Sequence, residues 1–218
     1  MAPDKDHSHK KTDIVSNKAA QETIMLQPPT PDGGLPLMQA LRNRKSTHSF
    51  IPLEITDQHL SELLWAANGI NRNISFKGRE WMRTAPSAKN HQEIELYVFL
   101  ISGIYRYDAG GHCLSLVREG DHRKECGMQA FFAEVPVALC LVADFSKMGK
   151  YDEKKRAFYS GIDAGYVSQN IYLYCASAKL GTTACGLIDR KKLHRLLRLD
   201  DARAILSHPV GGMGSASI

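Results

Sequence analysis

The sequence predicts one α+β domain with a mostly antiparallel sheet, and three observations support this fold class. The chain has 218 residues, of which 43% are hydrophobic, enough for one sizeable core. Apolar runs typical of buried strands are mixed irregularly with helical patterns, whereas a parallel sheet with crossover helices would require regular alternation. No internal repeat is present, which excludes a solenoid or a propeller.

The first 34 residues differ in composition from the rest of the chain. They are polar, poor in aromatics and end in a run of prolines and glycines at Pro28–Gly34. We expect a flexible arm over residues 1–34, or an arm that wraps a partner subunit, followed by a compact domain over residues 35–218. His7 and His9 could pair on a metal, but histidines in a polar tail are more often solvated, so no metal site is expected.

Two amphipathic helices are predicted at the start of the domain. The first follows Pro36, a favourable first-turn residue, and has apolar residues at helical spacing as far as Arg44. The second begins after Thr56, a suitable N-cap, and ends at Gly69. Its apolar stripe has i, i+3, i+4, i+7 spacing and consists of Leu60, Leu63, Leu64 and Ala67.

Buried strands are predicted in the middle of the chain. Residues 94–101 form an apolar run, and a glycine-containing turn leads through a hairpin into a strand over 113–117. A polar helix is expected at 121–133. Residues 135–143 are again apolar, with Pro136 near the start, where a strand tolerates proline.

The last third begins with a long helical stretch over residues 153–179. Small and apolar side chains occur on nearly all of its faces, so we expect burial in a core or a subunit interface. We expect Gly181 to cap this helix at its C-terminus. A short strand at 182–185, a helix at 189–198, a strand at 203–207 and a frayed tail containing Gly211, Gly212 and Gly214 complete the predicted elements.

Charge, cysteines and hydropathy restrict the function class. The net charge of +5 favours anionic partners, but it is too small to prefer nucleic acid over a phosphorylated small molecule. The five cysteines contain no C-x-x-C pair, which predicts reduced, mostly buried thiols. No apolar run approaches the length of a membrane helix, about 18 residues. The N-terminus lacks the apolar region of a signal peptide, which is typical of a cytoplasmic protein; a periplasmic form whose leader has been removed is the alternative.

The segment Arg44-Lys45-Ser46-Thr47-His48 is the first candidate binding site. If it is extended, Arg44, Ser46 and His48 point to one side, and Lys45 adds a further positive charge. A guanidinium, a hydroxyl and an imidazole on one side suit a phosphate group. The alternative is a solvated basic turn.

Two further segments could contact a flat heterocycle. The loop before residue 94 is dense in hydrogen-bonding groups and contains Pro86, Ser87, Ala88, Asn90 and Gln92. Near the end of the chain, Gly186 after Cys185 would allow close approach of a ligand to the backbone. The alternatives are a polar connecting loop and an ordinary strand end.

Other motifs narrow the choice. The chain has no dinucleotide-binding G-x-G-x-x-G after a strand, no phosphate-binding P-loop and no G-x-S-x-G nucleophile elbow. Asp163 within the long helix could be catalytic, but a hydrogen bond that anchors the helix is the favoured reading. Cys185 is not expected to be a nucleophile, and no residue is identified as catalytic.

Together these segments resemble the nitroreductase family of FMN enzymes between about Leu35 and Gly211. The stretch from Arg44 to Phe50 is similar to the family's R-x-S-x-[RK] motif, and 86–92 to its P-S-x-x-N-x-Q loop. Residues 163–170 are similar to its D-A-G-x-x-x-Q-N helix start, and 206–211 to the closing strand before P-V-G. Residues 64–72 resemble the branch that includes peptide azoline dehydrogenases.

The resemblance implies a three-layer α/β/α fold and an entwined homodimer. FMN would lie at the subunit interface, and the long helix would form the dimer core. Arg44, Lys45, Ser46 and His48 would hold the phosphate and ribityl chain. The loop residues Pro86, Ser87, Ala88, Asn90 and Gln92 would line the isoalloxazine, and the backbone at Cys185 and Gly186 would approach flavin N5.

Two departures from the family pattern concern the phosphate. His48 stands where the family usually has Arg or Lys, so this position carries less positive charge at neutral pH. The Lys-x-Arg pair that some members have near the C-terminus is absent after Pro209.

The activity implied is ping-pong transfer of hydride from NAD(P)H to FMN, and then of electrons to a nitroaromatic, quinone-like or other small acceptor. An FMN-dependent dehydrogenase that oxidises a peptide azoline or other organic substrate is the alternative. A non-catalytic basic binding protein is a remote alternative, because basic residues are spread along the chain and no nucleic-acid patch is evident.

Overall fold

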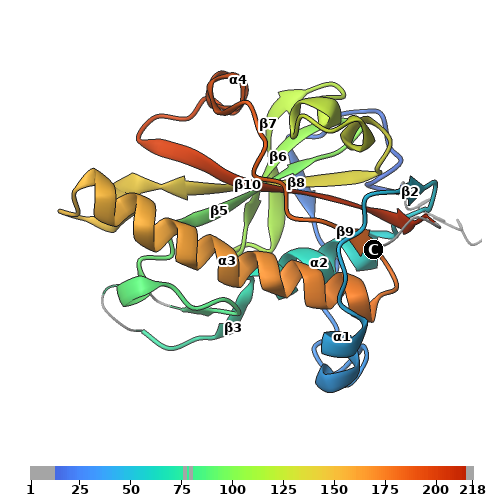
Figure 1. Cartoon of the computed structure of the whole chain (residues 1–218), viewed down its shortest axis with the longest axis horizontal. Coiled ribbons are helices and arrows are strands. Elements are labelled where there is room, and N and C mark those ends of the chain that lie inside the picture. The colour runs from blue at the N-terminus through green and yellow to red at the C-terminus, as the bar shows by residue number, and fades with distance from the viewer. Residues whose placement is uncertain (1–12, 76–77, 79–80, 215–218) are drawn as a thin grey trace, which may run out of the picture.

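The computed structural model describes residues 13–75, 78 and 81–214, and these form a central sheet between two helical layers (Figure 1). The long helix and two shorter ones cover one face of the sheet, and one short helix covers the other. The helices are α1 (Leu37–Asn43), α2 (Asp57–Asn68), α3 (Glu153–Ser177) and α4 (Arg190–Leu196). The predicted α+β class is therefore confirmed.

The main sheet has eight strands in the order β1-β7-β6-β5-β8-β10-β2, with β9 paired to β10 outside this path. All pairings among the described strands are antiparallel. A separate two-stranded sheet joins β3 (Ile70–Arg72) to β4 (Met82–Arg83). The main strands are β1 (Thr23–Met25), β2 (Phe50–Ile51), β5 (Ile94–Phe99), β6 (Gly103–Asp108), β7 (Cys113–Glu119), β8 (Val137–Asp144), β9 (Gly181–Thr182) and β10 (Ala202–Met213).

Two hydrophobic clusters fill the spaces between the layers. Alternate side chains of β5 point to opposite faces: Leu96 and Val98 pack with α2 and α3, whereas Tyr97 and Phe99 pack on the side of α4. Because both faces are covered, strands such as β5 and β8 are nearly all apolar, as the sequence analysis expected.

Several predicted boundaries are confirmed by their capping contacts. The Thr56 side chain accepts a hydrogen bond from the backbone N–H of His59, at 3.2 Å, and Gly69 follows the last turn of α2. The predicted hairpin is the pair β6–β7, and the long helix is α3.

The N-terminal segment differs from the expected flexible arm where it is described. Residues 23–25 form β1 and pair with β7, and Val15, Ile24 and Leu26 belong to the larger hydrophobic cluster. The polar composition of the segment did not indicate that these three apolar side chains are buried, because their packing partners are distant in the sequence. Residues 1–12, including His7 and His9, lie outside the described residues.

The expected helix at 121–133 is wrong. Two short 3₁₀ turns, at Arg123–Glu125 and Ala130–Ala133, lie there instead. Gly127 between them packs against the buried ring of Phe132, and a Cβ at this glycine would lie 2.0 Å from that ring. Burial of the ring against a glycine therefore outweighs the helical propensity of the polar residues around it.

The expectations for the C-terminal glycines are also wrong. Gly181 does not cap α3: it lies in β9, where a Cβ would be 2.9 Å from the Thr47 side chain, and Lys179 makes the left-handed turn at φ 59°. Gly211 and Gly212 belong to β10, and Gly214 donates its backbone N–H to Ser49. This tail forms sheet contacts because the missing side chains allow neighbouring backbone to approach closely.

The long helix is buried on one side only within the chain. Ala164, Val167 and Ile171 are in the core, whereas Phe158, Ile162 and Tyr166 are 63%, 39% and 47% exposed. The expectation of a core position is thus met for half of the helix. Among the described residues, no helix is both long enough and apolar enough to cross a bilayer.

Candidate functional site

The fold brings the first and third predicted segments together at Tyr172 of α3. Its hydroxyl is 3.0 Å from the Ser46 hydroxyl and accepts a hydrogen bond from the Ala184 N–H at 2.8 Å. The Arg44 guanidinium lies over the Tyr172 ring, 5.5 Å from its centroid. A backbone hydrogen bond from Thr47 to the Thr182 carbonyl, 2.9 Å long, closes the same contact. The predicted phosphate segment and the predicted flavin N5 segment are therefore neighbours.

A buried histidine supports this arrangement from behind. His208 of β10 is within hydrogen-bond distance of Ser168 in α3, at 2.9 Å, and of Thr182 in β9, at 3.1 Å. Burial lowers the pKa of His208 to about 3, so the imidazole is neutral near pH 7. The histidine thus ties helix, strand and segment together without bringing a charge into the core.

The backbone after β9 presents an open face at Gly186. A Cβ at Gly186 would meet no atom closer than Leu206, at 4.0 Å. Cys185 next to it is fixed by an antiparallel bridge to Ser207, and burial raises the pKa of its thiol to about 11. A protonated, buried thiol is a poor nucleophile, which agrees with the sequence analysis.

The second predicted segment, the loop at 86–92, is held by hydrogen bonds and contains unusual backbone. Lys89, Asn90 and Gln92 all have left-handed φ angles, of 51°, 58° and 52°. Such angles cost non-glycine residues about 1 kcal/mol each and persist only where the surroundings impose them. Ser87 accepts a hydrogen bond from the Gln92 N–H, at 3.0 Å, and Asp163 accepts one from the Ala88 N–H, at 2.8 Å. The anchoring role expected for Asp163 is therefore present.

Some side chains of this loop already form hydrogen bonds within the protein, whereas others are free to bind a ligand. The Gln92 amide is buried and already bonded to the Trp81 carbonyl, to Asn90 and to Arg83. The amide nitrogen of Asn90, in contrast, is buried and has no hydrogen-bond partner among the described residues. The Asn90 amide nitrogen can therefore still donate a hydrogen bond to a ligand.

A pair of carboxyl groups lies behind the loop. Glu93 is fully buried, and burial together with the neighbouring Asp163 raises its pKa to about 8. Burial also raises the pKa of Asp163. Because two carboxylates this close cannot both ionise cheaply, the pair holds a proton at neutral pH. Neither the composition nor the spacing of the sequence indicated this pair.

Within one chain, the loop and the Tyr172 cluster remain separate. Their anchors, Asp163 and Tyr172, are nine positions apart on α3, which corresponds to roughly 13 Å along the helix axis. One chain therefore assembles two of the three predicted segments and leaves the third at another point along the same helix.

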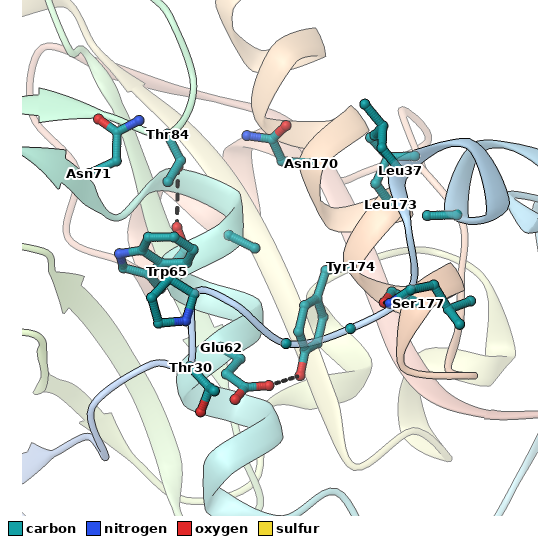
Figure 2. A pocket seen from close by; sticks show the side chains of 16 residues that line it. Thr30, Leu37, Glu62, Trp65, Asn71, Thr84, Asn170, Leu173, Tyr174 and Ser177 are labelled. Atoms are coloured by element: carbon teal, nitrogen blue, oxygen red, sulfur yellow. Dashed lines mark hydrogen bonds between the residues drawn. The ribbon is translucent and has the colours of Figure 1, made fainter.

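A cavity of about 450 Å³ lies between α1, α2, α3 and the segment at residues 30–35. Figure 2 shows Glu62 and Trp65 on one side and Asn170, Tyr174 and Ser177 on the other. Tyr174 donates to Glu62 at 3.2 Å. Burial alone would raise the pKa of Glu62, but hydrogen bonds from Gln58, Thr30 and Tyr174 outweigh it and lower the pKa. The volume is typical of a small-molecule pocket. No cluster of potential metal ligands occurs among the described residues.

Comparisons with known proteins agree with this fold. The model of the Nitroreductase family matches residues 41–212. A Methanocaldococcus jannaschii protein named "Putative nitroreductase" is 26% identical over 185 residues, which cover 80% of this chain and 90% of that protein. A crystal structure from Ralstonia eutropha, also titled a "putative nitroreductase", is 39% identical with a TM-score of 0.81, and covers 91% of this chain and 94% of that one.

A more distant structure shares the fold alone. The NADPH:FMN oxidoreductase of Vibrio harveyi, solved with NAD⁺, is 16% identical with a TM-score of 0.60, over 84% of this chain and 71% of that one. This chain belongs to the nitroreductase family and is an oxidoreductase.

Proposed function

We propose that the protein is an FMN-dependent oxidoreductase that uses NAD(P)H to reduce a nitroaromatic, quinone-like or other small acceptor. The observation that carries the proposal is the Tyr172 contact. It joins a phosphate-type segment, with Arg44 and Ser46, to the open backbone at Gly186. A ligand with a phosphate at one end and a flat ring at the other needs both features at adjacent positions.

The donor groups of the site fit FMN. Arg44 and Ser46 supply charged and neutral donors for a phosphate or a ribityl hydroxyl. The unpartnered amide nitrogen of Asn90 suits a ring carbonyl, since a buried donor is costly unless it finds an acceptor. Bound FMN would supply the redox chemistry, accepting hydride at N5 and returning electrons to the acceptor.

The chain's own residues would bind and orient the cofactor and the substrate. Tyr172 would hold Ser46 and the Ala184 backbone in register, and the neutral His208 would keep β9 against α3. The open backbone at Gly186 would let the ring and a stacked substrate approach closely. The cavity beside Trp65 is the proposed place for the acceptor, because Thr84 in its wall is only two residues before the start of the loop at 86–92.

We propose a homodimer in which the loop at 86–92 of one chain completes the site of the other. Support comes from the separation of loop and Tyr172 cluster along α3. The exposed apolar side chains of this helix, together with Leu37 and Met38 of α1 at 62% and 75% exposure, suit a subunit interface.

The first test is the visible spectrum of the purified, desalted protein. A yellow protein that releases FMN on boiling, and whose colour bleaches anaerobically with NADH or NADPH, would support the reductase. A colourless protein that fails to take up added FMN would refute the flavin assignment and favour the non-catalytic binding protein.

A dehydrogenase acting on an organic or peptide azoline is the second candidate, favoured by the sequence of residues 64–72. It predicts a flavin that NADH and NADPH do not bleach, but that an azoline-containing peptide does.

A further inference from the structure

We propose that Arg42, Lys45 and Lys179 form a binding pocket for a phosphate monoester, beside the Tyr172 cluster. These residues line a cavity of about 400 Å³ between the C-terminal ends of α1 and α3 and strand β9. The identity of the ligand rests on the proposed function, which offers two sources of this chemistry: the 5′-phosphate of FMN and the 2′-phosphate of NADPH.

The charged side chains that line this cavity are all positive. No aspartate or glutamate lines it, and none of the three cations forms an ion pair with a described residue. The carbonyl ends of α1 and α3 carry about half a negative charge each, which offsets only part of three positive charges. The three side chains are exposed but line one hollow, so a dianionic phosphate there would be attracted to all three positive charges.

The walls provide more than charge. Tyr172 and Thr182 line the same cavity, and its apolar lining comes from Cys175, Leu180 and Met213. Lys179 has a left-handed φ of 59° at the turn after α3, where glycine would be less strained. Lysine at this position adds a positive charge to the lining of the cavity, whereas glycine would add none.

The pocket also supplies positive charge that two departures from the family pattern remove. His48 replaces the usual Arg or Lys, and the C-terminal Lys-x-Arg pair is absent. Lys179 lies in the turn after α3 rather than in the C-terminal segment, so it is a different source of positive charge near the same segment, 44–48. No sequence motif would connect residues 42, 45 and 179.

The experiment compares Lys45→Gln and Lys179→Gln with Lys154→Gln as a control. Lys154 is an exposed lysine near the other end of α3, roughly 35 Å away along the helix, and its replacement removes the same charge. Dissociation constants are measured for FMN and for riboflavin, which lacks the phosphate, and kcat/KM for NADPH and NADH. Thermal unfolding confirms that each variant is folded. Lys45 lies outside the left-handed turn, so it provides a variant without backbone strain.

We expect each pocket variant to weaken phosphate recognition by about three- to tenfold, with a loss that shrinks as salt is added. Weaker FMN binding with unchanged riboflavin binding would identify the FMN phosphate as the ligand. A kcat/KM ratio of NADPH to NADH that falls would identify the dinucleotide phosphate. If both pocket variants match Lys154→Gln with all four ligands, the pocket assignment is wrong.

A flavin-free measurement separates this inference from the proposed function. Calorimetric titration of the full chain with 2′,5′-ADP needs neither flavin nor turnover. A chain that binds no flavin, but binds 2′,5′-ADP in a manner that depends on Lys45 and Lys179, would refute the flavoenzyme and retain the phosphate pocket.

Discussion

At the scale of single residues, Tyr172 connects more of the candidate site than any residue identified from the sequence. Its hydroxyl lies between Ser46 and the Ala184 N–H, and its ring lies under Arg44. In the sequence it is one aromatic among many in a helix. Nothing in helical periodicity distinguishes a tyrosine that packs from one whose hydroxyl joins two distant segments.

We expect Tyr172→Phe to lower the free energy of unfolding by about 2 kcal/mol, because two neutral hydrogen bonds of about 1 kcal/mol each are lost. We also expect it to weaken FMN binding by about tenfold, because Ser46 and the Ala184 backbone are no longer held in register. Fluorescence titration with FMN measures the affinity. Tyr97→Phe is the matched control, since Tyr97 packs on the side of the sheet covered by α4, away from α3 and Tyr172. Equal affinities of the two variants would show that Tyr172 does not organise the site.

The buried Glu93 predicts a defined pH dependence of stability. Its folded pKa of about 8 lies above the ordinary value of 4.5, so the folded state holds a proton that the unfolded state releases. Stability from this group is complete below pH 4.5 and is lost as pH rises through about 8. His208, with its lowered pKa, acts oppositely but only below about pH 6.5.

Between pH 6.5 and 8, the free energy of unfolding should therefore fall by up to about 1.4 kcal/mol per pH unit from Glu93. In Glu93→Gln we expect this slope to flatten, because the amide has no proton to lose. Urea unfolding at several pH values measures both proteins. A wild-type slope that survives in Glu93→Gln would show that other groups cause it.

At the scale of elements, local signals predicted the helices and strands whose ends are marked by their own side chains. Thr56 and Gly69 bounded α2, and continuous apolar runs located β5 and β8. The failures depend on contacts distant in sequence. β10 extends through its glycines because β8, β9 and β2 lie alongside it, and the 121–133 segment is bent by the packing of one ring.

The same distinction applies to the candidate site. Residues 44–48, 86–92 and 185–186 could be found because each has a characteristic composition. The contacts that relate them, through Tyr172, His208 and Asp163, are made between elements. Single-chain composition carries no information about such pairings, and the resemblance to a family supplied only their expected roles.

We expect Gly127→Ala to destabilise the fold by about 1–3 kcal/mol, because the new methyl group would overlap the Phe132 ring. Gly33→Ala is the control: a Cβ there would lie 3.4 Å from the nearest atom, an ordinary contact, so stability should change by less than about 0.5 kcal/mol. Chemical denaturation gives both values. A neutral Gly127→Ala would mean that the ring moves aside at no cost.

At the scale of the whole molecule, exposed apolar side chains are concentrated on α1 and α3. Leu37, Met38, Phe158 and Ile162 all lie on these two helices, which pack together on one face of the sheet (Figure 1). Exposed apolar side chains on neighbouring helices are costly in water and are typical of an interface.

We expect Ile162→Glu to convert a dimer into monomers, because it places an unpaired charge in the proposed interface. Sedimentation velocity measures the state, and FMN binding should weaken together with it. Met25→Glu is the control, since Met25 is 66% exposed on β1, at the far end of the sheet. A monomeric wild-type protein that binds FMN tightly would contradict the shared site.

The pairing of β10 also constrains how the protein is made in the cell. β2 and β9 pair with no described strand except β10, and β8 has β10 as one of its two neighbours. During translation β10 leaves the ribosome after all of these partners. Until then, β2 and β9 have no strand to join and one edge of β8 stays open. We therefore expect the nascent chain to be most prone to aggregation in the interval before β10 completes the sheet.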